Sequence, residues 1–180
     1  MLKITIEGIE LYDEIKEEFI ETKTQTLTLE HSLVSISKWE SKWRRPFLSK
    51  EPMSTEETID YVKCMTIERN VDPNLYLGLT NDHVEEIKQY IENPMTATTF
   101  SREEKGRNSG EIVTSELIYY WMTVFHIPPE YQKWHLNRLL TLIKICNIKN
   151  QPPKKMSQRD VMSRNAALNA ARRKRLNSKG

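Results

Sequence analysis

Histidine and cysteine are the residue types of this chain best able to bind a metal ion or to act in nucleophilic catalysis. The 180 residues include four histidines and two cysteines. The closest grouping is His126, His135 and Cys146, whose spacings of nine and eleven residues match no common zinc-ligand pattern. No G-x-S-x-G turn is present, and no serine or cysteine has a histidine at a spacing typical of a nucleophile and its base. The sequence therefore predicts neither a metal site nor a catalytic nucleophile.

Adjacent acidic residues are the candidates for general acid–base catalysis. They occur at Glu56-Glu57, Glu85-Glu86 and Glu103-Glu104, on helix faces predicted to be polar or in a polar loop. Solvated surface charge is the simpler interpretation of such pairs. The five glycines form no glycine-rich loop after a strand, so neither common nucleotide-binding fingerprint is present. We therefore expect a protein that is not an enzyme and needs no cofactor.

The four tryptophans are the candidates for binding rather than for catalysis. Trp39 and Trp43 lie four residues apart, and Trp121 and Trp134 flank the pair Pro128-Pro129. At helical spacing among leucines and isoleucines, tryptophan usually belongs to a hydrophobic core. Any part of these rings that remains exposed could anchor another protein chain.

The C-terminal segment carries most of the positive charge. Residues 154–180 contain nine Lys or Arg and one acid, which leaves 18 basic and 24 acidic residues in 1–153 from totals of 27 and 25. The net charges are therefore +8 and −6. The run Arg172–Arg175 fits a solvated terminus, docking on an acidic protein surface such as a neighbouring copy, or contact with nucleic-acid phosphates. It has no interleaved aromatic residues for base stacking. These three alternatives stay open.

The apolar stretch 112–148 predicts the centre of the fold. Apolar residues recur there at steps of three and four, first in Leu117, Ile118, Trp121, Val124 and Phe125, then in Leu136, Leu139, Leu140 and Ile143. Pro128 and Pro129 separate the two series, because proline lacks the N–H that a continuing helix needs. Pro129 can also occupy the first turn of the second helix. This pattern predicts a hairpin of two antiparallel helices.

The N-terminal region predicts strands and the remainder predicts helices. Alternating apolar residues at Leu2–Ile6, Glu18–Ile20 and Gln25–Leu29 favour an antiparallel meander. Helices are expected over Glu30–Arg44, after the capping box of Ser54 and Glu57, and after Thr80 or Asn81. The predicted fold is α+β and predominantly α-helical: an N-terminal β meander, a helical bundle and a basic C-terminal helix. We expect a body over 1–150, a Pro/Lys linker over 151–156 and a helical tail over 157–180.

The composition is that of a globular protein inside the cell. No apolar run approaches the roughly 18–20 residues that span a bilayer, so no membrane partner is expected. The first residues lack the basic region and apolar block of a signal peptide. Cys64 and Cys146 each lie on the apolar side of a predicted helix, which favours buried free thiols in a reducing compartment over a disulfide.

Several segments resemble a known group of phage proteins. They are HSLVSISKWESKWRRPFLS (31–49), DYVKCMT (60–66), PMTATTF (94–100), YQKWHLNRLLTLIKICNIKNQPPKKM (131–156) and SRNAALNAARRKRLNSKG (163–180). With them, nearly the whole chain is similar to the tail assembly chaperones of siphovirus-type phages and prophages of Gram-positive bacteria. These are encoded next to the tape measure protein. The resemblance brings no catalytic residues.

The resemblance implies a non-enzymatic chaperone in the host bacterial cytoplasm. Such proteins coat the long helical tape measure protein before the tail tube forms around it. We expect Trp121, Trp134, Leu139 and Ile143 to form a binding groove, if part of the hairpin is exposed. Arg172, Arg173 and Arg175 are expected to support electrostatic docking. A homo-oligomer is possible.

Two other functions remain open from the sequence. One is a structural virion component, such as a tail-completion or connector protein, which would stay in the mature particle. The other is a small nucleic-acid-binding protein that uses the basic tail, whose affinity would fall steeply with salt.

Overall fold

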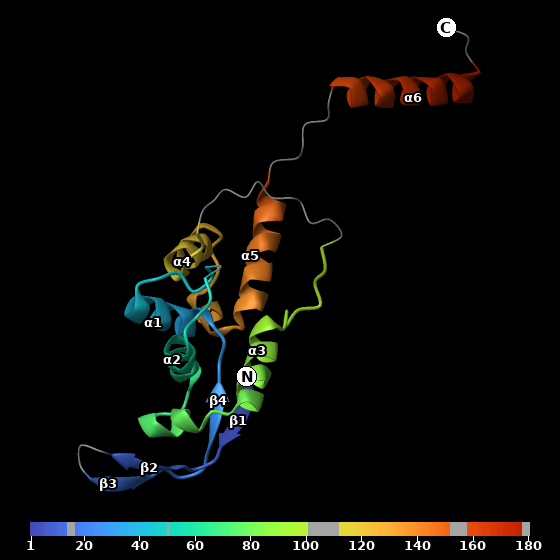
Figure 1. Cartoon of the computed structure of the whole chain (residues 1–180). Coiled ribbons are helices and arrows are strands. Elements are labelled where there is room, and N and C mark those ends of the chain that lie inside the picture. The colour runs from blue at the N-terminus through green and yellow to red at the C-terminus, as the bar shows by residue number, and fades with distance from the viewer. Residues whose placement is uncertain (14–16, 50, 101–111, 152–157, 178–180) are drawn as a thin grey trace. The chain divides into compact units, whose positions relative to one another are not determined.

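The computed structural model describes residues 1–13, 17–49, 51–100, 112–151 and 158–177 (Figure 1). The fold is α+β and mainly helical, as predicted. The chain divides into two compact units, Met1–Asn147 and Ile148–Gly180. The predicted polar loop at 101–110 lies outside the described residues, as does the predicted linker apart from Gln151. The predicted domain boundaries stay predictions.

The N-terminal strands form two antiparallel pairs in place of the predicted meander. Strand β1 (Leu2–Ile6) pairs with β4 (Gln25–Leu29), and β2 (Glu10–Asp13) pairs with β3 (Glu18–Glu21). The first strand therefore pairs with the last, and the β2–β3 hairpin lies between them in the sequence (Figure 1). Burial gives the reason.

Strands β1 and β4 each have one apolar face, and pairing with each other buries both faces. Ile4 lies opposite Leu27 in the register, and Ile6, Leu27 and Leu29 are fully buried. On the hairpin, by contrast, the facing rings of Tyr12 and Phe19 are exposed. Hydrophobic burial therefore selects the β1–β4 pairing.

The chain crosses itself closely where it leaves β1. A Cβ atom added at Gly8 would lie 2.1 Å from the carbonyl oxygen of Thr22. The backbone N–H of Gly8 donates to the Thr24 hydroxyl, and the N–H of Thr22 donates to the Ile9 carbonyl at 2.9 Å. Only glycine permits this approach.

Helices α1 (Leu33–Trp43) and α2 (Thr55–Met65) begin at capping serines. Ser32 caps α1, and Ser54 forms the predicted capping box with Glu57 on α2. Helix α1 starts three residues later than predicted, because Ser32 caps it and the Glu30 N–H donates to the Met65 carbonyl outside the helix. Its end at Arg44 is in the left-handed conformation.

A 3-10 helix and a third α-helix follow. They are η1 (Pro73–Gly78) and α3 (Asn81–Glu92), and Thr80, one of the two predicted caps, caps α3. Ile87 is buried and Ile91 is half-buried, but Val84 is 40% exposed.

The predicted helical hairpin is interrupted. Helix α4 (Ser115–Val124) is followed by a 3-10 helix, η2 (Pro129–Lys133), and then by α5 (Leu136–Asn150). Pro129 therefore opens η2, whereas α5 begins seven residues later. Helix α4 packs mainly on α1 rather than on α5.

One hydrophobic core joins the sheet β1–β4 to the helices. Its largest fully buried side chains are Trp39, Ile6, Leu27, Leu29, Leu33, Ile36, Met65, Leu75, Ile118, Leu136, Leu139 and His31. The centre of the core is thus shared between α1 and the sheet, and α5 contributes Leu136 and Leu139.

The second unit contains α6 (Gln158–Leu176). None of the described residues of this helix is buried. Most of its residues are polar or charged, and its exposed apolar side chains are Val161, Met162, Leu168 and Leu176. Among the described residues, no helix is both long and apolar enough to cross a membrane.

Candidate protein-interaction site

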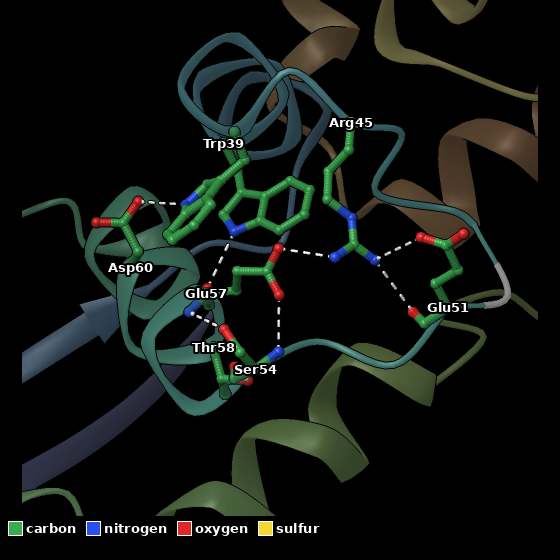
Figure 2. Close-up of polar contacts among 8 residues, drawn as sticks. Trp39, Arg45, Glu51, Ser54, Glu57, Thr58 and Asp60 are labelled. Atoms are coloured by element: carbon green, nitrogen blue, oxygen red, sulfur yellow. Dashed lines mark hydrogen bonds and ion pairs between the residues drawn. The ribbon is translucent and has the colours of Figure 1, made fainter.

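A polar network fixes α2 against α1 (Figure 2). The Glu57 carboxylate accepts hydrogen bonds from the Ser54 N–H at 2.7 Å and from Arg45 Nη1 at 2.8 Å. The Trp39 indole N–H donates to the Glu57 carbonyl at 3.0 Å. Hydrogen bonding from the Ser54 backbone, joined by the charge of Arg45, lowers the pKa of Glu57.

Asp60, one turn along α2, completes this network. Its carboxylate accepts from the Trp43 indole N–H at 2.9 Å and from Lys42 Nζ at 2.5 Å. Trp39 and Trp43, predicted as core residues, are therefore both oriented by hydrogen bonds as well as by packing. The consequence is a rigid α1–α2 pair whose outer side forms one wall of a groove.

That groove lies between α2, η1 and α3 and has a volume of about 690 Å³. Its apolar lining includes Met53, Ile59, Leu77, Val84, Ile87 and Ile91. Leu77 is 57% exposed, so the apolar surface is open to solvent. Sequence reasoning did not predict this groove. A signal was available in Leu77 and Leu79, two apolar residues in the segment between two predicted helices.

A second, smaller groove lies between α4 and α5, with a volume of about 340 Å³. It is lined by Trp121, Phe125, Leu140, Ile143, Lys144 and Asn147. Two of the residues predicted for binding, Trp121 and Ile143, thus share one groove, although Ile143 is only 6% exposed. The apolar walls and the Lys144 ammonium suit a helix with an apolar stripe flanked by acidic residues.

The other two residues predicted for this groove lie elsewhere. Leu139 is completely buried and belongs to the core, so it presents no surface. Trp134 stacks on Tyr131 with ring centroids 4.0 Å apart, and the Arg138 guanidinium lies 4.0 Å from its ring centroid. The two tryptophans therefore belong to different sites, because η2 separates the elements that were predicted to face each other.

The structure brings His31 and His135 together, a pair that the sequence spacing did not suggest. Their ring centroids are 4.9 Å apart. His31 Nδ1 bonds with the Tyr61 hydroxyl, while His135 Nε2 donates to the Tyr90 carbonyl at 3.0 Å. Burial, with a smaller effect of His135, lowers the pKa of His31 to about 3. Burial also lowers the pKa of His135.

This pair, of a buried His31 and a half-buried His135, has the chemistry of a structural element. His31 is 2% exposed, so a substrate does not reach its ring in this conformation. The His135 Nδ1 atom already accepts from the Asn137 N–H at 3.3 Å. Within the described ranges, no group of three or more His, Cys, Asp or Glu side chains could hold a metal ion.

The predicted docking arginines lie on α6. Arg172, Arg173 and Arg175 are all exposed. Helix α6 contains six basic residues and one acid, Asp160, which gives it a net charge of +5.

Comparisons with protein-family models, with curated proteins and with solved structures find no match.

Proposed function

We propose that this protein is a phage tail assembly chaperone, which binds the tape measure protein in the host bacterial cytoplasm and keeps it soluble during tail assembly. The sequence resemblance supplies the partner. The observation that carries the binding mode is the open groove between α4 and α5, which contains Trp121.

A helical tape measure protein exposes apolar stripes that would otherwise associate. A helix-in-groove contact covers such a stripe with side chains at successive turns. Trp121 on α4 and Phe125, the residue that follows the end of α4, form one apolar wall, opposite Leu140 on α5. Helix α5 carries Arg138, Lys144 and Lys149 and no acidic residue, which favours a partner with acidic flanks.

The test compares two aromatic residues of α4 in the full-length protein. Trp121→Ala removes one wall of the groove, and we expect at least a tenfold loss of affinity for the tape measure protein, as for a buried aromatic anchor. Tyr120→Ala is the matched control, because Tyr120 is 62% exposed and does not line the groove. Equal binding by both variants, with circular dichroism showing both folded, would overturn the assigned groove.

A structural virion component is the main alternative. Such a component remains in the particle, whereas a chaperone leaves before the tail is complete. Mass spectrometry of purified virions therefore separates the two. A fixed number of copies per particle would support the structural role.

Nucleic-acid binding is favoured by one observation, the exposed basic run Arg172–Arg175 on α6. Phosphate contacts release counterions, so binding through this run would weaken steeply with salt. Retention of the intact protein on DNA at 50 mM salt and its loss at 200 mM, with no capture of the tape measure protein, would support this alternative.

A further inference from the structure

We propose that the groove between α2, η1 and α3 binds helix α6 of a second copy of this protein. This contact is separate from the α4–α5 groove assigned to the tape measure protein. It does not depend on the identity of that partner.

The groove presents an apolar surface that this chain leaves open. Leu77 and Val84 line it and are 57% and 40% exposed, while Ile59 and Ile91 are half-buried beside them. Since α2 is fixed by Glu57 and Asp60 through the network with α1, this wall is preorganised. Preorganised apolar surface of this size is typical of a binding site for a helix.

The charge beside the groove is negative. Helix α3 carries four exposed acids, Asp82, Glu85, Glu86 and Glu92, against one lysine, Lys88. Glu92 and Lys88 both line the groove directly. Glu85 lies four residues after Asn81 and seven before Glu92, both groove-lining residues, and is therefore on the same side of α3. An occupant with apolar and basic side chains fits this surface.

Helix α6 has the complementary properties. Its net charge of +5 matches the net −3 of α3 in sign, and none of its described residues is buried in its own copy. Val161, Leu168 and Ala171 follow one another at seven and three residues, so they lie on one side of the helix. Arg172 and Arg175 lie on the same side, four and seven residues after Leu168, and their long side chains can extend to the acids of α3.

The described residues of α6 are all exposed, so its apolar and basic side chains can bind another molecule. Each copy then offers one groove and one tail, so the contact is head-to-tail. Such contacts generate rings or open chains rather than twofold dimers. A chain of copies is suited to cover an elongated partner.

The test uses two charge-reversal variants of the full-length protein. The tail variant is R172E/R175E, and the groove variant is E85R/E92R. Light scattering with size-exclusion chromatography gives the mass of each variant over a range of concentrations. We expect the wild type to associate and each variant alone to associate at least about tenfold more weakly. The control variant is E10R/E18R, which reverses exposed charges on the β2–β3 hairpin. It should associate like the wild type.

Mixing the two variants is the decisive step. In an equimolar mixture the reversed charges of the tail variant meet the reversed charges of the groove variant, and the unaltered tail of the groove variant meets the unaltered groove of the tail variant. The first contact again pairs opposite charges at the exchanged positions and the second is the wild-type contact, so the mixture should associate like the wild type at low salt. A wild-type protein that stays monomeric, association that persists in either variant, or a mixture that is not rescued would each overturn the proposal. Binding of α6 to its own copy would give the first of these outcomes.

Discussion

The buried His31 and the half-buried His135 couple the stability of the fold to pH. Both rings are held neutral, because desolvation lowers their pKa values below that of an exposed histidine. In the unfolded chain each ring binds a proton near pH 6.5. Between this value and the folded pKa of His31, about 3, the unfolded state binds more protons, so acid favours unfolding.

The free energy of unfolding should therefore fall as the pH is lowered from 7 to 5. The expected slope approaches about 1.4 kcal/mol per pH unit for a fully shifted histidine. Urea denaturation at half-unit intervals measures it. His31→Gln should flatten the slope, whereas His126→Gln, at an exposed position, should leave it unchanged. Parallel slopes for wild type and His31→Gln would contradict this assignment.

A single methyl group at Gly8 should also destabilise the fold. The added Cβ would lie 2.1 Å from the Thr22 carbonyl oxygen, a backbone atom that cannot move without shifting β3 and β4. We expect Gly8→Ala to lower the free energy of unfolding by about 1–3 kcal/mol. Gly78→Ala is the matched control, because its nearest neighbour is the Ile6 side chain at 3.1 Å. Thermal melts that show equal losses would contradict the role of Gly8.

At the scale of elements, Glu40 joins α1 to the start of α4. Its buried carboxylate accepts from the Ser115 N–H at 2.7 Å and from the Phe47 N–H at 2.8 Å. Ser115 is the first residue of α4, where backbone N–H groups lack partners within the helix. A negative charge is also favourable at this end of a helix. Glu40 therefore helps to place α4, which carries Trp121.

Glu40→Ala should leave these two N–H groups without an acceptor and loosen α4. A buried donor without an acceptor costs about 1–3 kcal/mol, so we expect a loss of at least this size. Hydrogen exchange should accelerate at Ser115 and the following turn of α4. Glu86→Ala, at an exposed position on α3, should change neither quantity. Unchanged exchange at Ser115 in Glu40→Ala would show that α4 is placed by packing alone.

The elements differ in how far the sequence could predict them. The caps at Ser54 and Thr80 were predictable, because they depend on residues three positions apart. The pairing of β1 with β4 was not, since alternation identifies a strand without naming its partner. For the same reason, Trp121 and Ile143 were correctly placed on helices, but their separation from Trp134 depends on η2, which the proline pair did not reveal.

At the scale of the molecule, the body and α6 contribute different properties. The core belongs to Met1–Asn147, whereas α6 contributes charge and exposed apolar side chains. The sequence could predict the charge difference because charge is a sum over residues. The groove between α2 and α3 was missed, because a groove arises only when separate elements are packed together.

Deletion of residues 154–180 should leave the body folded. None of the described residues of α6 is buried or belongs to the hydrophobic core. At micromolar protein concentration we expect one cooperative thermal transition, with a midpoint within a few degrees of the full-length value. A midpoint that rises with concentration only in the full-length chain would reflect binding of α6 between copies. Loss of cooperative melting would show that the predicted boundary of the body is wrong.

The central claim is that this protein binds the tape measure protein and keeps it soluble. The most direct measurement is co-expression of the two full-length proteins, followed by affinity capture and quantification of soluble tape measure protein. The account predicts a soluble complex with the wild type and with Tyr120→Ala, and little soluble tape measure protein with Trp121→Ala or with none of this protein present. A tape measure protein that is equally insoluble with and without this protein, both being well expressed, would contradict it.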